Sequence, residues 1–288
     1  LITGSYDIPA ATLRARAVFT NTMPTQAYRS SGRPEVNYAI ERLIEIAARR
    51  LGMDKIDLRR KNLVSPEAMP YKNGVGAVYD SGTYETNMDR AMVIAGWADK
   101  EARRADAKAR GKLLGVGLAN YVESSIGSPK ERAEIVVKTD GTMEVVIGTQ
   151  PSGQGHETSF AQVAADMMGV PVEQVKIIVG DTDIVSVGGG SHSGRSMRHA
   201  GTVIALASED LINKGRAIAA LHFKLPEDRV SFDDGQFVVK DTNFSIGVFE
   251  LAKVAAQMDL PDALKGGMAV ARDNEMHDPV FPNGTAIC

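Results

Sequence analysis

The first part of the chain shows helical spacing of its hydrophobic residues. Residues 10–20 have the pattern of a strand, and Pro34 then opens an amphipathic helix. On this helix the apolar residues recur at helical intervals, as Ile40, Leu43, Ile44 and Ala47. The pattern predicts a second helix from about residue 54 and a longer helix over residues 84–109. We therefore expect this part of the chain to be mainly helical.

After Lys112 the hydrophobic pattern becomes that of strands. Residues 113–122 are apolar, and two alternating stretches, 133–137 and 143–148, flank a hairpin turn at Thr139-Asp140-Gly141. The pattern also predicts a hairpin over residues 230–239 and helices over residues 157–168, 197–221 and 247–258. The residues beyond these are expected to form a loose tail. Helices that alternate with hairpin-joined strands favour an α+β fold.

Composition narrows the class of protein without naming a function. The 288 residues are 43% hydrophobic and carry a formal net charge of −3, so no electrostatic footprint for nucleic acid is visible. No apolar run approaches the roughly 20 residues that span a bilayer. Cys288 is the single cysteine, which excludes a disulfide, a cysteine-based zinc site and a cysteine-ligated iron–sulfur cluster within this chain.

The first of three unusual loops covers residues 26–34 and runs into a helix. It holds Arg29 and Arg33 among small residues, including Ser30 and Ser31. Small residues let backbone N–H groups approach a ligand, and a helix N-terminus favours an anion. An ordinary arginine-bearing helix cap is the simpler interpretation of the same residues.

The second loop covers residues 148–158 and joins a strand to a helix. Gly153 and Gly155 flank Gln154, so that backbone and side-chain amide can both face a bound oxyanion or phosphate. The loop lacks the Gly-Lys-Ser/Thr ending of a P-loop. A zinc protease motif is excluded as well, because Phe160 and not a histidine stands four residues after His156.

The third loop covers residues 188–196 and again leads into a helix. Its hydroxyl groups, backbone amides and Arg195 could form a second anion-binding nest. A serine-hydrolase elbow is excluded, because His192 stands at the centre of the Gly190–Gly194 pentamer. A flexible surface loop remains the alternative. The residues alone thus predict an α+β protein whose strand–loop–helix joints bind a polyanionic ligand.

Taken in order, the loop motifs are more specific than any one of them. Residues 27–35 and 58–63, followed by residues 153–158, 180–183 and 194–197, resemble the molybdenum hydroxylases. This is the family of xanthine dehydrogenase, aldehyde oxidase and aerobic carbon monoxide dehydrogenase. The resemblance implies a molybdopterin-binding domain with hairpin-rich mixed sheets, packed helices and two lobes. The two parts of that binding region would be residues 1–110 and 111–288.

The resemblance also implies roles for individual residues. Arg29 and Gln154 would act at the catalytic centre, and the metal would be held by the pterin and not by the protein. Cofactor contacts are expected from Gly153, Gln154, Gly155, Ser193, Gly194, Arg195 and Ser196. In the substrate pocket, Ser30 stands where carbon monoxide dehydrogenase carries its copper-binding cysteine, and a hydroxyl cannot replace that soft thiolate. Ser31 stands where xanthine-oxidising members carry a stacking aromatic residue, which speaks against a purine substrate.

The implied protein is an oxidoreductase that hydroxylates an aldehyde or N-heteroaromatic carbon with oxygen from water. Its molybdenum cofactor is expected in the cytosine dinucleotide form. An iron–sulfur subunit with 2Fe–2S clusters and an FAD subunit would take the electrons, in a cytoplasmic dimer of heterotrimers without a membrane span. We expect the chain to be an internal fragment of a larger subunit, inactive alone because the general-base glutamate lies outside it.

Two alternatives stay open. One is a carbon monoxide dehydrogenase-like large subunit that lacks the copper-binding cysteine. The other is a molybdopterin- or nucleotide-binding module without catalytic activity.

Overall fold

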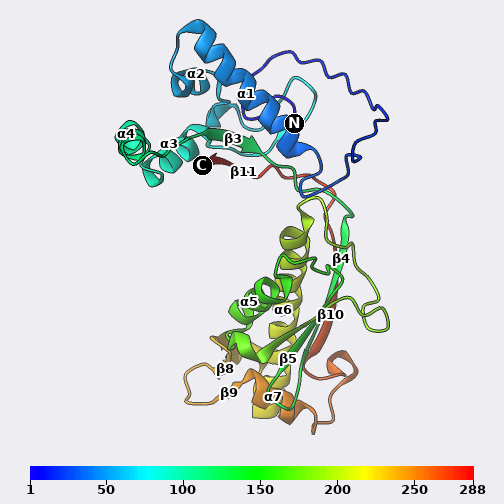
Figure 1. Ribbon diagram of the computed structural model, residues 1–288. Coiled ribbons are helices and arrows are strands. Elements are labelled where there is room, and N and C mark those ends of the chain that lie inside the picture. Colours follow the sequence, from blue (N-terminus) through cyan, green and yellow to red (C-terminus); the bar gives the residue numbers. More distant parts are fainter. The chain divides into compact units, whose positions relative to one another are not determined.

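The computed structural model describes residues 1–288 and divides the chain into two compact units (Figure 1). The first unit comprises residues 1–125 and 279–288, and the second comprises residues 126–278. The sequence predicts a boundary between the two parts of the binding region after residue 110. In the structure the first unit continues to residue 125 and also includes residues 279–288. The second unit is thus inserted, in sequence, between two segments of the first.

The first unit is mainly helical. Its helices are α1 (Arg33–Leu51), α2 (Lys55–Asn62), α3 (Tyr84–Ile94) and α4 (Lys100–Ala109), with 3-10 turns at Pro66–Ala68 and Trp97–Asp99. Its strands are β1 (Tyr71–Lys72), β2 (Val78–Tyr79), β3 (Leu118–Val122) and β11 (Asn283–Ile287). They form two small antiparallel sheets, in which β1 pairs with β2 and β3 pairs with β11.

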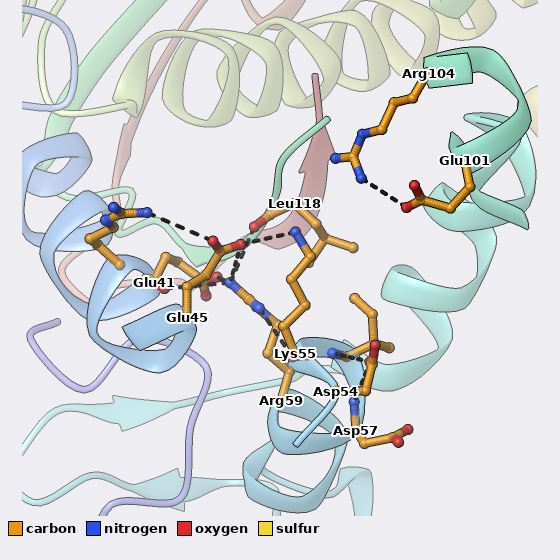
Figure 2. Close-up of polar contacts among 11 residues, drawn as sticks. Glu41, Glu45, Asp54, Lys55, Asp57, Arg59, Glu101, Arg104 and Leu118 are labelled. Carbon is orange, nitrogen blue, oxygen red and sulfur yellow. Dashed lines mark hydrogen bonds and ion pairs between the residues drawn. The ribbon is translucent and has the colours of Figure 1, made fainter. Parts of the chain in front are cut away.

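A buried ion pair holds α1, α2 and β3 together (Figure 2). The guanidinium of Arg59 is fully buried, and its Nη2 lies 2.8 Å from Oε2 of Glu41 on α1. The same nitrogen donates to the carbonyl oxygen of Leu118 at 3.3 Å, and Glu41 also accepts a hydrogen bond from the Tyr6 hydroxyl. Because each buried charge has its partners, the usual cost of burying it is offset.

The single helix expected over residues 84–109 is wrong, because the structure has two helices there. α3 ends at Ile94, and Gly96 adopts φ +59 before a 3-10 turn leads into α4. Glycine takes a left-handed conformation without the steric cost that other residues carry, so it ends a helix readily. The turn allows Trp97 to be buried in a small core with Ile56, Met88 and Leu118.

The strand expected over residues 10–20 is also wrong. These residues form no regular structure and are largely exposed, with the Phe19 side chain fully open to solvent. A strand is stable only where a neighbour takes up its backbone hydrogen bonds, and no strand pairs with this segment. Likewise, only the end of the apolar stretch 113–122 is a strand, since β3 starts at Leu118.

The second unit contains two sheets and three α-helices. A four-stranded sheet has the order β10 (Ala269–Glu275), β4 (Lys130–Val137), β5 (Met143–Ile147) and β6 (Val175–Ile178). A three-stranded sheet consists of β7 (Val230–Asp233), β8 (Gln236–Val239) and β9 (Ser245–Gly247). The helices are α5 (His156–Met168), α6 (Arg195–Phe223) and α7 (Val248–Ala255), with 3-10 turns at Val172–Gln174, Glu227–Arg229 and Asp262–Leu264.

The core of the second unit lies between the four-stranded sheet and two helices. Alternate residues of β4, namely Ala133, Ile135 and Val137, are buried, as the alternating sequence pattern predicts. α6 packs against β4 and β10, and α5 packs against α6 and β6 (Figure 1). Small residues such as Ala200 and Ala207 on the buried face of α6 allow this close approach. The core positions the two strand–loop–helix joints that precede α5 and α6.

The loose tail expected after residue 258 is wrong, because the chain forms two further strands there. β10 runs antiparallel to β4 along its whole length, from Ala269 beside Val136 to Glu275 beside Lys130. β11 pairs in the same way with β3 of the first unit. The expected α+β class is confirmed. In addition, no helix has the length and apolar character that a membrane span would need.

Candidate functional site

Two loops of the second unit cross each other at close range. The first, residues 148–155, joins β5 to α5, and the second, residues 188–194, leads into α6. A Cβ atom on Gly148 would lie 2.2 Å from the Cα atom of Gly188, and one on Gly188 would lie 2.3 Å from the Cα atom of Gly148. Only glycine at both positions permits this crossing, which brings the second and third sequence motifs into one site.

Side chains join the same two loops. The Gln154 side-chain amide donates from Nε2 to the Ser191 hydroxyl at 3.0 Å. Ser191 is in turn hydrogen-bonded to the hydroxyl of Ser196, at 2.7 Å, on the first turn of α6. Gln154 is exposed, so its amide stands at the surface of the site and not within the core.

Both helices begin at a glycine in the left-handed conformation. Gly155 precedes α5 with φ +73, and Gly194 precedes α6 with φ +69. Neither glycine supplies a side-chain cap, and at the start of α6 the N–H of Arg195 donates to the carbonyl oxygen of His192 at 3.0 Å. No atom lies within 4 Å of a Cβ built on Gly153, Gly155 or Gly190. The site therefore offers backbone donors, the positive ends of two helix dipoles and room for an anion.

Arg195 lies beneath these loops and is fully buried. Its Nη1 forms an ion pair with Oε2 of Glu131 at 2.8 Å and also donates to the carbonyl oxygen of Gly190 at 2.6 Å. Its Nε and Nη2 donate to the carbonyl oxygens of Ser128 and Lys130, at 2.9 and 3.1 Å. All the hydrogen bonds described for the guanidinium thus go to acceptors within the protein. We infer that Arg195 stabilises the conformation of the loops.

Glu131 shares in this support. Its Oε2 also accepts hydrogen bonds from the Thr149 hydroxyl at 2.6 Å and from the backbone N–H of Gly189 at 3.3 Å. The carboxylate is 1% exposed, so it binds the start of each loop from inside the protein. Several charge-assisted hydrogen bonds on one buried group fix geometry more firmly than neutral ones.

Three histidines lie near the loops, and two of them are structural. The buried His156 ring stacks on Phe160, and its Nδ1 lies 3.3 Å from the carbonyl oxygen of Thr149. His199 is buried on α6, and burial together with the positive charge of Arg195 lowers its pKa. The exposed His192 lies 3.1 Å through Nε2 from the carbonyl oxygen of Gly189. No group of three or more His, Cys, Asp or Glu side chains could hold a metal ion.

The arginine loop belongs to the first unit. Three consecutive residues are left-handed, Ser30 at φ +66, Ser31 at φ +42 and Gly32 at φ +90, and Gly32 precedes α1. Non-glycine residues in this conformation cost free energy, and such strain is concentrated at functional sites. Arg29 is exposed, with its guanidinium 5.9 Å from the centre of the Tyr28 ring.

Arg33 holds the strained loop at residues 30–32 in place. Its Nη1 donates to the carbonyl oxygen of Ser30 at 2.8 Å, and its Nη2 donates to the carbonyl oxygen of Ser124 at 2.8 Å. Its Nε lies 2.7 Å from Oε1 of Glu123. Of the two arginines in this motif, Arg33 is therefore the support, and Arg29 is the one whose charge is free to meet a ligand.

The structure thus brings Gln154, Ser193, Gly194, Arg195 and Ser196 to one site of the second unit, and places Arg29, Ser30 and Ser31 in the first. From the sequence, Ser191 has no role beyond its place among the hydroxyl groups of the third loop, and Thr149 and the two buried carboxylates have none. The carboxylates lie in segments whose patterns suggest an exposed face, since Glu41 is on an amphipathic helix and Glu131 is at the start of a strand. Ser191 is within the third motif but has no distinguishing spacing.

The first unit also contains a cavity of about 350 Å³. Glu41, Glu45 and Arg59 line it together with the ends of β3 and β11. The guanidinium of Arg59 already donates hydrogen bonds to Glu41, Leu118 and Lys55 (Figure 2). These donors in the wall of the cavity are therefore engaged within the protein.

Two family models match the chain, both described as a molybdopterin cofactor-binding domain. They cover residues 1–63 and residues 90–288. Over its whole length the chain is 33% identical to the carbon monoxide dehydrogenase large chain of Afipia carboxidovorans, of which it covers 38%. Over 97% of its length it is 30% identical to the 6-hydroxypseudooxynicotine dehydrogenase complex subunit gamma of Paenarthrobacter nicotinovorans, of which it covers 36%.

Solved structures show the same architecture. The chain matches a crystal structure of Cu,Mo-CO dehydrogenase with a TM-score of 0.85 and 33% identity, over 100% of this chain and 38% of that one. It matches quinoline 2-oxidoreductase from Pseudomonas putida 86 with a TM-score of 0.80 and 28% identity, over 99% of this chain and 38% of that one. The chain spans well under half the length of each of these relatives.

Proposed function

Because the chain belongs to the molybdopterin cofactor-binding family of molybdenum hydroxylases, we propose that it holds the molybdenum cofactor of an oxidoreductase. The observation that carries this proposal is the crossing of loops 148–155 and 188–194, which places two helix starts and the Gln154 amide together. A pterin with a phosphate-bearing tail is a polyanion, and the two helix starts offer the N–H donors that such an anion needs.

The residues fit such a group. The open space over Gly153, Gly155 and Gly190 lets a planar or anionic ligand approach the backbone, and a side chain at these positions would fill it. When bound, the cofactor would supply the two-electron oxidation of a carbon centre, with oxygen that comes from water. Backbone N–H groups at the starts of α5 and α6 and the Ser193 hydroxyl would hold its phosphate oxygens.

Within this proposal, Gln154 would donate an N–H to an oxygen of the bound group. Arg195 and Glu131 keep the two loops in register from below, and Ser196 anchors the hydroxyl chain on α6. In the first unit, Arg29 offers an exposed positive charge on a strained, well-supported turn. Such a charge orients an anionic or polarised substrate or cofactor oxygen.

For the substrate, we propose an aldehyde or an N-heteroaromatic ring. The likeness to quinoline 2-oxidoreductase supports a heteroaromatic substrate. Ser30 supports it further, because a hydroxyl is a poor ligand for copper, the second metal of the similar Cu,Mo-CO dehydrogenase. Turnover of aldehydes and N-heterocycles with an artificial electron acceptor, and none of carbon monoxide, is the expected result.

A second candidate is a carbon monoxide dehydrogenase-like large subunit without copper. The 33% identity and TM-score of 0.85 with carbon monoxide dehydrogenase favour it. Oxidation of carbon monoxide by the copper-free complex, with no turnover of heterocycles, would establish this candidate instead. A module that binds the pterin but oxidises none of these compounds would correspond to a non-catalytic function.

For partners, we propose an iron–sulfur subunit and an FAD subunit, in a dimer of heterotrimers. With Cys288 as its one cysteine, this chain cannot supply the four thiolates of a 2Fe–2S cluster. The relative from Paenarthrobacter nicotinovorans is itself named as one subunit of a dehydrogenase complex. We propose the cytosine dinucleotide form of the cofactor, whose second phosphate would use the second helix start.

The proposal is tested on the complete subunit purified with its partners. Metal analysis and the fluorescence of the released, oxidised pterin are expected to give both groups in equal amounts. The Gln154→Ala variant is expected to retain the fold and to lose turnover by about tenfold or more, as when one polar contact to a reacting centre is removed. A complex free of molybdenum and pterin would contradict the proposed function. Full activity of the Gln154→Ala variant would contradict the role assigned to Gln154.

A further inference from the structure

The orientation of the Gln154 amide is fixed by an unambiguous donor. Its Oε1 accepts a hydrogen bond from the backbone N–H of Ser152. A backbone N–H can only donate, so the oxygen of the amide must face Ser152 and the nitrogen must face the other way. That nitrogen lies 3.0 Å from the hydroxyl oxygen of Ser191. The amide is thus held at both ends by two different loops.

Ser191 is itself held in place. Its hydroxyl is bonded to Ser196 on the first turn of α6, and the preceding carbonyl, that of Gly190, accepts from the buried guanidinium of Arg195 at 2.6 Å. The Gly148–Gly188 crossing fixes the base of the loop. Ser191 therefore links the first turn of α6 to the side chain of Gln154, which precedes α5 in the sequence.

We propose that Ser191 is the positioning residue for Gln154. It occupies one of the two N–H groups of the amide and leaves the other as the donor that faces a ligand. This inference rests on the proposed function, because the ligand is the molybdenum cofactor. Without Ser191 only the bond from Ser152 to Oε1 holds the terminal amide, whose torsion is broad in glutamine, so its donor is less closely directed.

The test compares Ser191→Ala with Ser191→Thr, which keeps a hydroxyl, in the complete subunit with its partners. The matched control is Ser186→Ala, an exposed serine earlier in the same segment. Loss of one hydrogen bond corresponds to a factor of about 3–10. We expect Ser191→Ala to lower kcat and to speed pterin release by that factor, with KM unchanged and the melting temperature lowered by no more than about 2–4 °C, because the bond to Ser196 is lost as well. Ser191→Thr and Ser186→Ala should resemble the wild type.

A second readout does not depend on activity. In the 288-residue chain without cofactor, the two side-chain N–H protons of Gln154 should give separate NMR signals. These signals are assigned by their loss in Gln154→Ala. In Ser191→Ala we expect their separation to shrink and their exchange with water to become faster.

The outcomes separate the inference from the proposed function. A wild-type subunit without pterin would overturn both. A loaded wild-type subunit with unchanged kcat, pterin release and amide signals in Ser191→Ala would overturn the role of Ser191 alone. Equal effects of Ser186→Ala and Ser191→Ala, or no recovery in Ser191→Thr, would also overturn it, because the change would then not depend on the hydroxyl at residue 191.

Discussion

The buried guanidinium of Arg195 forms several of the hydrogen bonds that hold the loops of the second unit in place. It joins the segment before β4, the loop before α6 and the carboxylate of Glu131. A buried ion pair adds little net stability, but removal of one partner leaves an uncompensated charge in the interior. The main effect of the Arg195–Glu131 pair is therefore to fix the geometry of the loops, and it adds little to the net stability of the fold.

Arg195→Ala is expected to lower the free energy of unfolding by about 3–5 kcal/mol. Arg132→Ala is the matched control, because Arg132 lies next to Glu131 but pairs with Glu134 and Asp273 at a partly exposed site. Such pairs contribute about 0–1 kcal/mol. Urea unfolding of the three proteins measures the difference. Similar losses for the two variants would contradict the role assigned to the buried pair.

His199 predicts a dependence of stability on pH. Burial lowers its pKa in the folded protein, whereas the unfolded chain binds a proton near pH 6.5. Below that pH the unfolded state binds more protons, so the free energy of unfolding falls as the pH falls. His199→Gln should reduce this fall between about pH 7 and pH 5, as measured by urea unfolding at each pH. Identical slopes for variant and wild type would show that His199 does not titrate as its burial indicates.

At the scale of elements, the site is a consequence of how two loops cross. Neither loop has a long side chain at the crossing, where Gly148 meets Gly188 and also approaches the carbonyl oxygen of Val187. Cores and crossings of this density do not take up an extra methyl group without movement.

Gly148→Ala is expected to destabilise the chain by about 1–3 kcal/mol and to weaken pterin binding, because the added methyl group separates the loops. Gly201→Ala is the control: it lies within α6, where the new Cβ would be 3.6 Å from the Met197 side chain, an ordinary contact. Alanine favours a helix, so this variant should be as stable as the wild type or slightly more stable. Thermal unfolding decides between these outcomes, and a tolerated Gly148→Ala would contradict the tight crossing.

The elements that the sequence predicts well are those with local signals. The helices α1, α2, α5 and α6 follow from the sequence pattern, and the β4–β5 hairpin follows from its turn at Asp140-Gly141. β10 and β11 escape prediction because their partners are far away in sequence and their own patterns are polar or short. A strand with one exposed edge needs no hydrophobic alternation of its own.

The site is predictable to the same extent. Glycine-rich loops in front of helices mark where a ligand can approach, so residues 153–155 and 193–196 can be chosen from the sequence. The supports cannot, because Arg, Glu and Thr are usually exposed, and only the fold shows that Arg195, Glu131 and Thr149 are buried together. For the same reason the sequence suggests Arg195 as a ligand for an anion, although its guanidinium faces inward.

At the scale of the whole molecule, the second unit is inserted into the first and has its own core. The large cluster of buried apolar residues lies within residues 126–278. The two ends of the insertion approach each other, since Lys130 and Glu275 are partners in the β4–β10 ladder. A unit with its own core and adjacent ends can fold independently.

Residues 126–278 expressed alone are therefore expected to fold cooperatively. Circular dichroism should show the helices α5 and α6, and urea should unfold the unit in one transition. The same unit with Arg195→Ala serves as a destabilised reference. Absence of a cooperative transition in the wild-type unit would mean that it depends on the first unit for its stability.

The pairing of β3 with β11 sets an order of events during synthesis. Asn120 of β3 and Thr285 of β11 bond to each other across 165 residues of sequence. At a typical rate of translation, β3 waits on the order of ten seconds for its partner. By then the whole second unit has been made, so it is the first part able to complete its core. Until β11 arrives, β3 presents an open strand edge, and aggregation at that edge is the hazard that this topology brings to the newly made chain.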